Sequence, residues 1–240
     1  MPQNLPPLIL LSAGGTGGHV FPARALAEVL LARGYRVALA TDRRGEKYFA
    51  GIDCVPLYIL ASGGYQAGVM GKIKGAVGLL QGYVAAHFLL SKIKPSIVVG
   101  FGGYPSAPAV FAAQHHRIPT VLHEQNAILG LANSLLAPCA NGLALSFANT
   151  AKVKEKWNAK SRVIGNPVRA DIAALGPKNY PKIENMLNVL IVGGSQGARV
   201  FGTIIPESIT TLPLELRQKL IIAHQARPED LEHVKSMYLG

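Results

Sequence analysis

The sequence predicts an α/β protein made of two Rossmann-like halves, each built on a doubly wound parallel sheet. Short apolar runs alternate with helical stretches along the chain, a pattern typical of parallel sheets covered by helices. A glycine-rich loop follows an apolar run twice, at 14–18 and at 193–197. Such a loop before a helix presents free backbone N–H groups and a positive dipole end to a phosphate. Two of them indicate a diphosphate or a sugar nucleotide held between the halves.

The first half begins with a strand–helix–strand unit. Apolar residues predict strands over 8–12 and 36–41, and the stretch 22–33 between them is helical, with Pro22 at its start. This crossover should be right-handed. Residues 65–94 then predict a long helix, because apolar side chains recur at spacings of three and four.

The rest of the first half continues this alternation. Strands are expected over 96–100 and 120–123, with a helix over 107–115 between them, and a further helix and strand lead to Phe147. The strand at 96–100 opens onto a third glycine turn at 100–106. The loops after these strands meet at the carboxyl edge of the sheet, where open α/β proteins bind ligands.

A charged, proline-rich segment over 150–188 separates the two halves. We expect residues 1–165 to form the first domain, and residues 166–240 to hold the linker and the start of the second. The second half begins at Leu187. Roughly 50 residues are too few for a complete doubly wound domain, so we expect the second domain to be truncated.

Charge and cysteine content narrow the classes of function. The net charge of +11, with only 13 acidic residues, implies an anionic partner, whether nucleic acid, an acidic membrane surface or a phosphorylated substrate. Cys54 and Cys139 are isolated, which argues against a disulfide framework and against zinc. His115 and His116 are adjacent and point to different sides, which favours surface residues over a metal pair. We therefore expect no metal and no cofactor.

The chain carries no sequence signal for a membrane span. Residues 1–7 lack a basic region, so we expect no signal peptide. No uninterrupted apolar run reaches the roughly 20 residues that a bilayer span needs. The apolar helix over 65–94 is flanked by lysines, a pattern compatible with lying on an anionic membrane surface and equally with packing in a core.

The first glycine loop leaves a second hypothesis open. Gly14–Gly18 is not a P-loop, because no lysine follows it, and it is not a clean G-x-G-x-x-G motif. Asp42 nevertheless lies at the end of the second strand, where a dinucleotide-binding fold places its ribose carboxylate. An NAD(P)-dependent oxidoreductase is therefore the alternative enzyme.

Five side chains near these loops are candidates for binding or catalysis. His19 begins a helix, where the dipole favours a neutral imidazole that accepts a proton, or it has only a capping role. Glu124 directly follows a strand and is a candidate general base, or else a salt-bridge partner. Asn126 suits a sugar or a turn, Arg169 suits a phosphate, and Ser195 suits a diphosphate.

Five motifs, in this order, resemble those of the MurG family of glycosyltransferases. They are GGTGGHVFP at 14–22, GGY at 102–104, HEQN at 123–126, GNPVR at 165–169 and GGSQGA at 193–198. The resemblance runs from about Leu8 to the end of the chain. It implies a GT-B fold, in which two Rossmann-like domains face each other across the site.

The resemblance also implies a reaction and its site. The reaction is an inverting, metal-free transfer of GlcNAc from UDP-GlcNAc to the C4 hydroxyl of lipid I, giving lipid II in peptidoglycan synthesis. His19 or Glu124 would deprotonate or orient the acceptor, and the resemblance does not decide between them. The UDP-GlcNAc contacts it implies are Thr16, Gly17, Gly18, Asn126, Arg169 and Ser195. Further substrate contacts, in part for the acceptor's diphosphate, are Gly14, Gly15, Gly103, Tyr104, Gln125 and Gln196.

The expected partners are UDP-GlcNAc, lipid I and the anionic cytoplasmic face of the inner membrane, with no nucleic acid. An oxidoreductase would leave the second glycine loop and the 124–126 segment unexplained. A third hypothesis is a non-catalytic module that keeps lipid-diphosphate or membrane binding, because members of the family carry a longer second domain.

Overall fold

The structure is a computed structural model that describes residues 5–52, 54–63, 68–176, 179, 185–194 and 198–239. It divides the chain into two compact units, Met1–Gly176 and Pro177–Gly240. This division falls after the expected boundary at residue 165. The 165–169 segment stays with the first unit, because His123 Nε2 donates a hydrogen bond to Gly165 O and the Arg169 guanidinium lies over the Phe21 ring.

The first unit is built on a seven-stranded sheet in the order β3-β2-β1-β4-β5-β6-β7, with every neighbouring pair parallel. The strands are β1 Leu8–Ser12, β2 Arg36–Thr41, β3 Leu57–Ile59, β4 Ile97–Gly100, β5 Thr120–Glu124, β6 Gly142–Leu145 and β7 Ser161–Val163. Strand order reverses between β1 and β4, which is the topological switch point of a doubly wound sheet. The predicted fold class is confirmed. Strand β7 lies in the segment that we had assigned to the linker.

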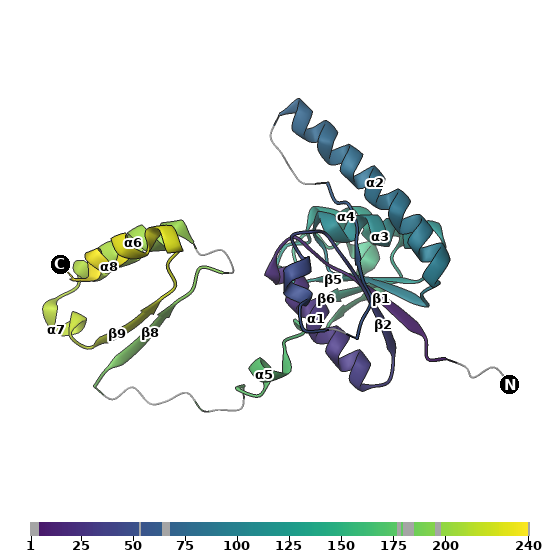
Figure 1. Ribbon diagram of the computed structural model, residues 1–240. Helices are drawn as coiled ribbons and strands as arrows, with labels where there is room; N and C mark the ends of the chain where they lie inside the picture. The colour runs from purple at the N-terminus through teal and green to yellow at the C-terminus, as the bar shows by residue number, and fades with distance from the viewer. Residues whose placement is uncertain are drawn as a thin grey trace. The chain divides into compact units, whose positions relative to one another are not determined.

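Helices cover both faces of this sheet (Figure 1). They are α1 Gly17–Ala32, η1 Glu46–Phe49, α2 Val69–Ile93, α3 Gly103–His115, α4 Leu131–Leu136, η2 Ala137–Cys139 and η3 Glu155–Lys160. The short helix α5 Ala170–Ala173 lies apart from the sheet and has no buried residue. Successive residues of a strand point to opposite faces, and β1 shows the result. Leu10 packs in one core with α2 and α3, whereas Leu11 packs in the other with α1 and η1.

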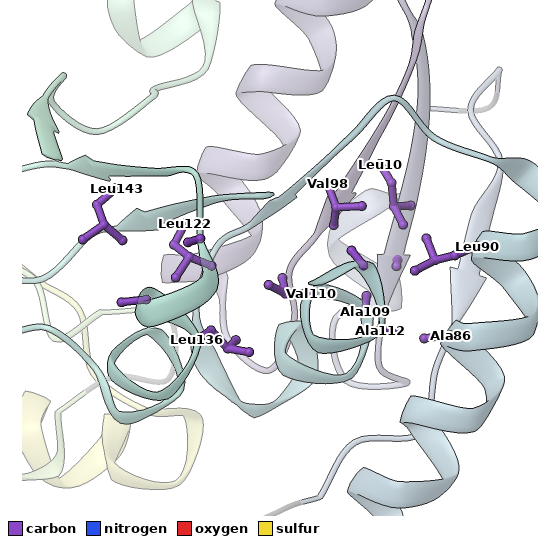
Figure 2. Close-up of a cluster of buried hydrophobic side chains, with 14 of the residues drawn as sticks. Leu10, Ala86, Leu90, Val98, Ala109, Val110, Ala112, Leu122, Leu136 and Leu143 are labelled. Atoms are coloured by element: carbon purple, nitrogen blue, oxygen red, sulfur yellow. The ribbon is translucent and has the colours of Figure 1, made fainter. Parts of the chain in front are cut away.

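The core beneath α2 and α3 joins alanines of the helices to larger apolar side chains of the sheet. Figure 2 shows Leu10, Val98 and Leu122 from the sheet facing Ala109 and Val110 of α3. All five side chains are almost fully buried. This packing fixes α3 against the sheet, and with it the position of the loop that precedes α3.

Helices α1 and α3 begin earlier than expected, at Gly17 and Gly103 rather than at 22 and 107. Pro22 lies inside α1 and Pro108 lies inside α3. The sequence suggested Pro22 as the start of its helix. The missing N–H of Pro22 leaves only a carbonyl of the first turn unpaired, so the helix continues through it. Both helices therefore start directly at the glycine loops.

Helix α2 is continuous over 25 residues, although glycines recur along it. A Cβ on Gly82 would overlap the carbonyl oxygen of Ala61, so this glycine lets the chain after β3 pass against the helix. The expected start at 65–67 lies outside the described residues.

By length and composition alone, α2 could cross a membrane, which corrects our expectation from apolar runs. Its most apolar window has a mean hydropathy of 1.3 and is only 17% buried. The lysines of α2 lie near its ends, so the stretch between them is apolar. A helix that packs inside a soluble protein can meet the same criterion, so this observation only identifies α2 as an exposed, apolar helix.

The second unit contains two parallel strands, β8 Leu187–Ile191 and β9 Leu220–His224, within its described part. Its helices are α6 Arg199–Thr210, α7 Leu214–Arg217, η4 Pro228–Asp230 and α8 Leu231–Leu239. Gly202 of α6 lies against Val234 of α8, which is buried. The strand–loop–helix–strand order is that of the first half of a Rossmann-like domain, as the sequence predicts.

Candidate active site

The loops after β1, β4 and β5 meet at the switch point of the first sheet. A pocket of about 170 Å³ there is lined by His19, Gly103, Tyr104, Glu124 and Asn126, among others. The structure therefore brings together five of the residues that the sequence singled out. These residues come from the starts of α1 and α3 and from the end of β5.

The glycines of the first loop divide into two pairs. A Cβ on Gly14 would lie 2.7 Å from Pro105 Cβ, and the N–H of Gly15 donates to Asp42 Oδ1 at 3.1 Å. This pair serves packing and the loop's own shape. Gly17 and Gly18 open α1, where the N–H groups have no intrahelical acceptor. This second pair offers free donors to a ligand.

Asp42 holds the first loop in place rather than binding a ribose. Its Oδ1 accepts hydrogen bonds from the N–H groups of Gly15 and Gly45, and its Oδ2 accepts from Arg44 Nε at 2.7 Å and from Ser62 Oγ at 3.2 Å. Burial opposes ionisation, but these hydrogen bonds and the Arg44 charge outweigh it, so the pKa of Asp42 lies below its ordinary 3.8. A carboxylate with four protein donors is not available to a nucleotide, and the oxidoreductase hypothesis loses its main support.

One ring nitrogen of His19, Nδ1, is hydrogen-bonded within the protein, and the other, Nε2, has no partner among the described residues. Its Nδ1 lies 2.9 Å from the carbonyl oxygen of Phe101 and 3.0 Å from Gln125 Oε1. A carbonyl oxygen only accepts, so Nδ1 carries the proton and Nε2 has the lone pair. The Nε2 edge faces Gly103, since a Cβ built there would lie 3.5 Å from Nε2. His19 can therefore accept a proton in the pocket.

Glu124 lines the same pocket, but its carboxylate is fully engaged. Oε1 accepts from the N–H and the Nδ2 of Asn126, at 3.1 and 2.8 Å. Oε2 accepts from the N–H of Gly130 and from Asn133 Nδ2, both at 2.9 Å. Its side chain is buried at 2% exposure. Four donors around a buried carboxylate indicate a brace for the loop between β5 and α4.

The side chains of Gln125 and Asn126 both form hydrogen bonds to other side chains of this chain. Gln125 lies between His19 and His123, with Nε2 2.9 Å from His123 Nδ1. Asn126 donates its amide to Glu124 and also lines the pocket. Gln125 was expected among the substrate contacts, and the structure instead gives it two protein partners.

Arg169 lies near the N-terminal end of α1. Its guanidinium is 5.2 Å from the centroid of the Phe21 ring, and Nε is 3.5 Å from Asp171. A pocket of about 240 Å³ is lined by Arg169 together with Gly17 and Gly18. This combination of free N–H groups and a guanidinium is suited to an anion. Thr16, just before the helix, is exposed.

The second glycine loop follows β8. Gln225 ties its start down, because the N–H of Gly193 donates to Gln225 Oε1 and Gln225 Nε2 donates to the carbonyl oxygen of Gly194, both at 3.0 Å. The predicted contacts Ser195 and Gln196 lie outside the described residues.

Sequence reasoning missed Phe21, Asn133 and Phe101 as parts of the site. Phe21 follows Gly17 by one helical turn, so an earlier helix start would have placed it beside the loop. Phe101 acts through its backbone carbonyl and Asn133 through a tertiary contact, and neither role has a sequence signal.

His115 and His116 each have a partner. His115 Nδ1 lies 2.7 Å from Tyr83 Oη, and His116 Nε2 lies 2.9 Å from His87 Nδ1. Over the described residues, no group of three or more metal-ligating side chains comes together.

Comparison with known proteins assigns the family. The glycosyltransferase family 28 N-terminal domain matches residues 9–145, more than half of the chain. The chain belongs to glycosyltransferase family 28. Its relatives in this family include the UDP-N-acetylglucosamine--N-acetylmuramyl-(pentapeptide) pyrophosphoryl-undecaprenol N-acetylglucosamine transferase of Paramagnetospirillum magneticum, which is 46% identical over 98% of this chain and 64% of the relative.

The same kind of enzyme from Caulobacter vibrioides is 44% identical over 96% of this chain and 64% of its own length. Among solved structures, MurG of Acinetobacter baumannii matches with a TM-score of 0.71 at 28% identity, over 98% of this chain and 63% of that one. The glycosyltransferase of kitacinnamycin shares the fold, with a TM-score of 0.62 at 14% identity. The resemblance predicted from the five motifs is confirmed. The chain spans about three fifths of the length of the curated relatives it matches.

Proposed function

We propose that this family 28 chain serves in the transfer of GlcNAc from UDP-GlcNAc to the C4 hydroxyl of lipid I, giving lipid II in peptidoglycan synthesis. The names of the relatives support the reaction. The observation that carries the proposal is the pocket in which an imidazole nitrogen lies open between two helix starts that follow glycine loops.

In this reaction His19 is the base. Its Nε2 takes the proton of the acceptor hydroxyl while the hydroxyl oxygen bonds to C1 of GlcNAc. The bond from C1 to the UDP oxygen breaks, and the electron pair leaves with UDP, so the configuration at C1 inverts. A positioned base of this kind contributes about 10²- to 10⁴-fold to the rate. Glu124 braces the loop and takes no proton, since its oxygens already accept four hydrogen bonds.

Substrate binding falls to groups around this base. The free N–H groups of Gly17 and Gly18, the α1 dipole and Arg169 suit a substrate diphosphate and stabilise the negative charge that develops on UDP. Tyr104 and the Gly103 turn, at the start of α3, suit the acceptor, with the Asn126 oxygen toward its sugar. No metal is needed in this scheme.

Helix α2 supports a peripheral position on an anionic membrane, which we place at the cytoplasmic face of the inner membrane. Its outer side exposes a row of apolar side chains, namely Val69, Met70, Ile73, Val77, Leu80, Val84 and Phe88. Lys72 and Lys74 lie near one end and Lys92 and Lys94 near the other, where they suit anionic headgroups. The net charge of +11 acts in the same direction, without a role for nucleic acid.

An apolar pocket beside α2 suits a lipid-linked acceptor. Its volume is about 310 Å³, and it is lined by Tyr83 and Phe111 among other apolar residues of α2, α3 and α4. It shares Tyr104, Leu131 and Ala132 with the pocket of His19. The lipid chain of an acceptor held at the base could therefore enter apolar surroundings at once.

The test is transfer of labelled GlcNAc from UDP-GlcNAc to a short-chain analogue of lipid I. Turnover supports the proposal. Binding of the analogue without turnover would instead make the chain a lipid-diphosphate-binding module. Protection of the chain by NADH and not by UDP-GlcNAc would return the oxidoreductase hypothesis.

A further inference from the structure

A chain of hydrogen bonds runs from His19 to the carbonyl oxygen of Gly165. His19 Nδ1 lies 3.0 Å from Gln125 Oε1, Gln125 Nε2 lies 2.9 Å from His123 Nδ1, and His123 Nε2 lies 3.2 Å from Gly165 O. His19 Nδ1 also contacts the carbonyl oxygen of Phe101 at 2.9 Å. The chain thus starts and ends on backbone carbonyls, which can only accept.

These two ends leave one consistent arrangement of protons. Phe101 O requires a proton on His19 Nδ1, so the atom of Gln125 that faces it must be the amide oxygen. The amide nitrogen of Gln125 then donates to His123 Nδ1, which must carry a lone pair. His123 therefore has its proton on Nε2, where Gly165 O accepts it. With both rings neutral, any other placement sets two donors or two acceptors against each other.

We propose that Gln125 and His123 are positioning residues that, together with the carbonyl oxygen of Phe101, hold His19 in the tautomer with Nδ1 protonated, so that Nε2 faces the pocket as the proton acceptor. The role of Nε2 in turnover rests on the proposed function. The tautomer is a property of the chain by itself, and it is measured without substrate.

The surroundings of His123 suit a fixed, neutral link. Its side chain is 2% exposed, and its ring packs 5.4 Å from the Phe101 ring, centroid to centroid. Burial lowers the pKa of His123 below its ordinary 6.5, although Gly165 and the neighbouring Glu124 charge act in the opposite direction. Glu124 itself is held by its four donors, and the carbonyl oxygen of His123 accepts from Asn133 Nδ2 at 3.1 Å.

The link also suits the state that follows proton transfer. When His19 Nε2 takes a proton, Nδ1 keeps its own and still donates to the same two oxygens. Hydrogen bonds from a charged donor are stronger than those from a neutral one, so the same contacts stabilise the imidazolium without rearrangement. The tautomer needed before the step is therefore also the geometry needed after it.

The experiment reads histidine ring tautomers from long-range ¹H–¹⁵N spectra of the whole chain at about pH 8, above the ordinary histidine pKa of about 6.5. We expect His19 protonated on Nδ1 and His123 protonated on Nε2. In Gln125→Met, which has no amide, His123 should lose its single tautomer and His19 should keep only its bond to Phe101, with a changed Nδ1 shift. In Gln125→Glu the carboxylate accepts from both rings, so His19 should keep its tautomer while His123 gains a proton on Nδ1.

Gln114→Met is the matched control, because the Gln114 amide also donates a hydrogen bond inside the first unit, to the carbonyl oxygen of Leu136, and lies outside the chain of bonds. It should leave both tautomers unchanged. A merely structural role would not predict that Gln125→Glu changes the protonation of His123 and leaves the tautomer of His19 unchanged. His19 protonated on Nε2 in the unsubstituted chain, or tautomers of both rings unaffected by either Gln125 variant, would overturn the proposal. The correct tautomers without any GlcNAc transfer would leave this proposal standing and contradict the proposed function.

Discussion

His19 and Glu124 line one pocket and differ in which of their atoms are free. Both were predicted as candidate bases from their places at a helix start and at a strand end, and those places are correct. The choice between them depends on tertiary hydrogen bonds that no sequence pattern reveals. Four N–H donors reach Glu124 from three residues, whereas His19 keeps one nitrogen without a protein partner in the described chain. The structure therefore favours His19 as the base.

This difference predicts how the two alanine variants behave. Glu124→Ala leaves four donors without their acceptor, among them the amide of the buried Asn133, so the free energy of unfolding should fall by about 3 kcal/mol. His19→Ala removes one half-buried ring and should cost about 1 kcal/mol. Urea unfolding measures both. An unchanged stability of Glu124→Ala together with complete loss of turnover would return the role of base to Glu124.

At the scale of elements, apolar runs predicted the central strands of the first sheet, but not β3 and β7 at its edges, and not the helix starts. Pro22 suggested the start of α1, but the helix begins at Gly17, and only this earlier start exposes the N–H groups of Gly17 and Gly18 beside Arg169. The glycines of α2 provide room for the chain after β3, as Gly82 does for Ala61. Close approach between segments far apart in the sequence has no local signature.

The outer side of α2 predicts a membrane contact that can be tested by substitution. Phe88 is 69% exposed, and burying such a ring in a membrane contributes about 2 kcal/mol. Phe88→Glu should therefore weaken binding to anionic vesicles by a factor of about 30, measured by co-sedimentation. Val29→Glu is the matched control, since Val29 of α1 is 47% exposed and lies on the other side of the sheet.

Equal losses in the two variants would mean that vesicle binding responds only to net charge. Raising the salt concentration should weaken binding by the unsubstituted chain, because the lysines near the ends of α2 are screened. Binding that is insensitive to salt would point to insertion of the apolar side alone.

At the scale of the whole molecule, the sequence predicted two halves with a boundary at residue 165, and the structure divides the chain into two units after Gly176. The 165–169 segment looked like linker because it is followed by charged and proline-rich residues. It belongs to the first unit because Gly165 and Arg169 contact side chains of β5 and α1. The basic charge predicts an anionic partner, but composition could not choose among nucleic acid, membrane and phosphorylated substrate. The resemblance of the glycine loops to those of the MurG family favours a phosphorylated substrate and a membrane surface over nucleic acid.

The free energy of unfolding of the first unit should decrease in two steps as the pH is lowered. The pKa of His123 is lowered by burial, so its contribution to stability is complete above about pH 6.5 and is lost as the pH falls through its folded-state pKa. The pKa of Asp42 is also lowered, and its contribution is lost below pH 3.8. In the upper step, His123 adds a slope of at most about 1.4 kcal/mol per pH unit.

Urea unfolding across this range measures the slope, and His123→Gln should remove the share of the upper step that His123 contributes. A pH profile that is the same in this variant would show that His123 titrates alike in the folded and unfolded chains.

The most direct measurement is the rate of GlcNAc transfer from UDP-GlcNAc to a short-chain lipid I analogue by the unsubstituted chain, by His19→Ala and by His233→Ala. His233 is exposed on α8 and serves as the control. We predict transfer by the unsubstituted chain and by His233→Ala, and a rate at least about 100-fold lower in His19→Ala. Equal rates in all three chains, or no transfer by the unsubstituted chain when the analogue is bound, would contradict the account.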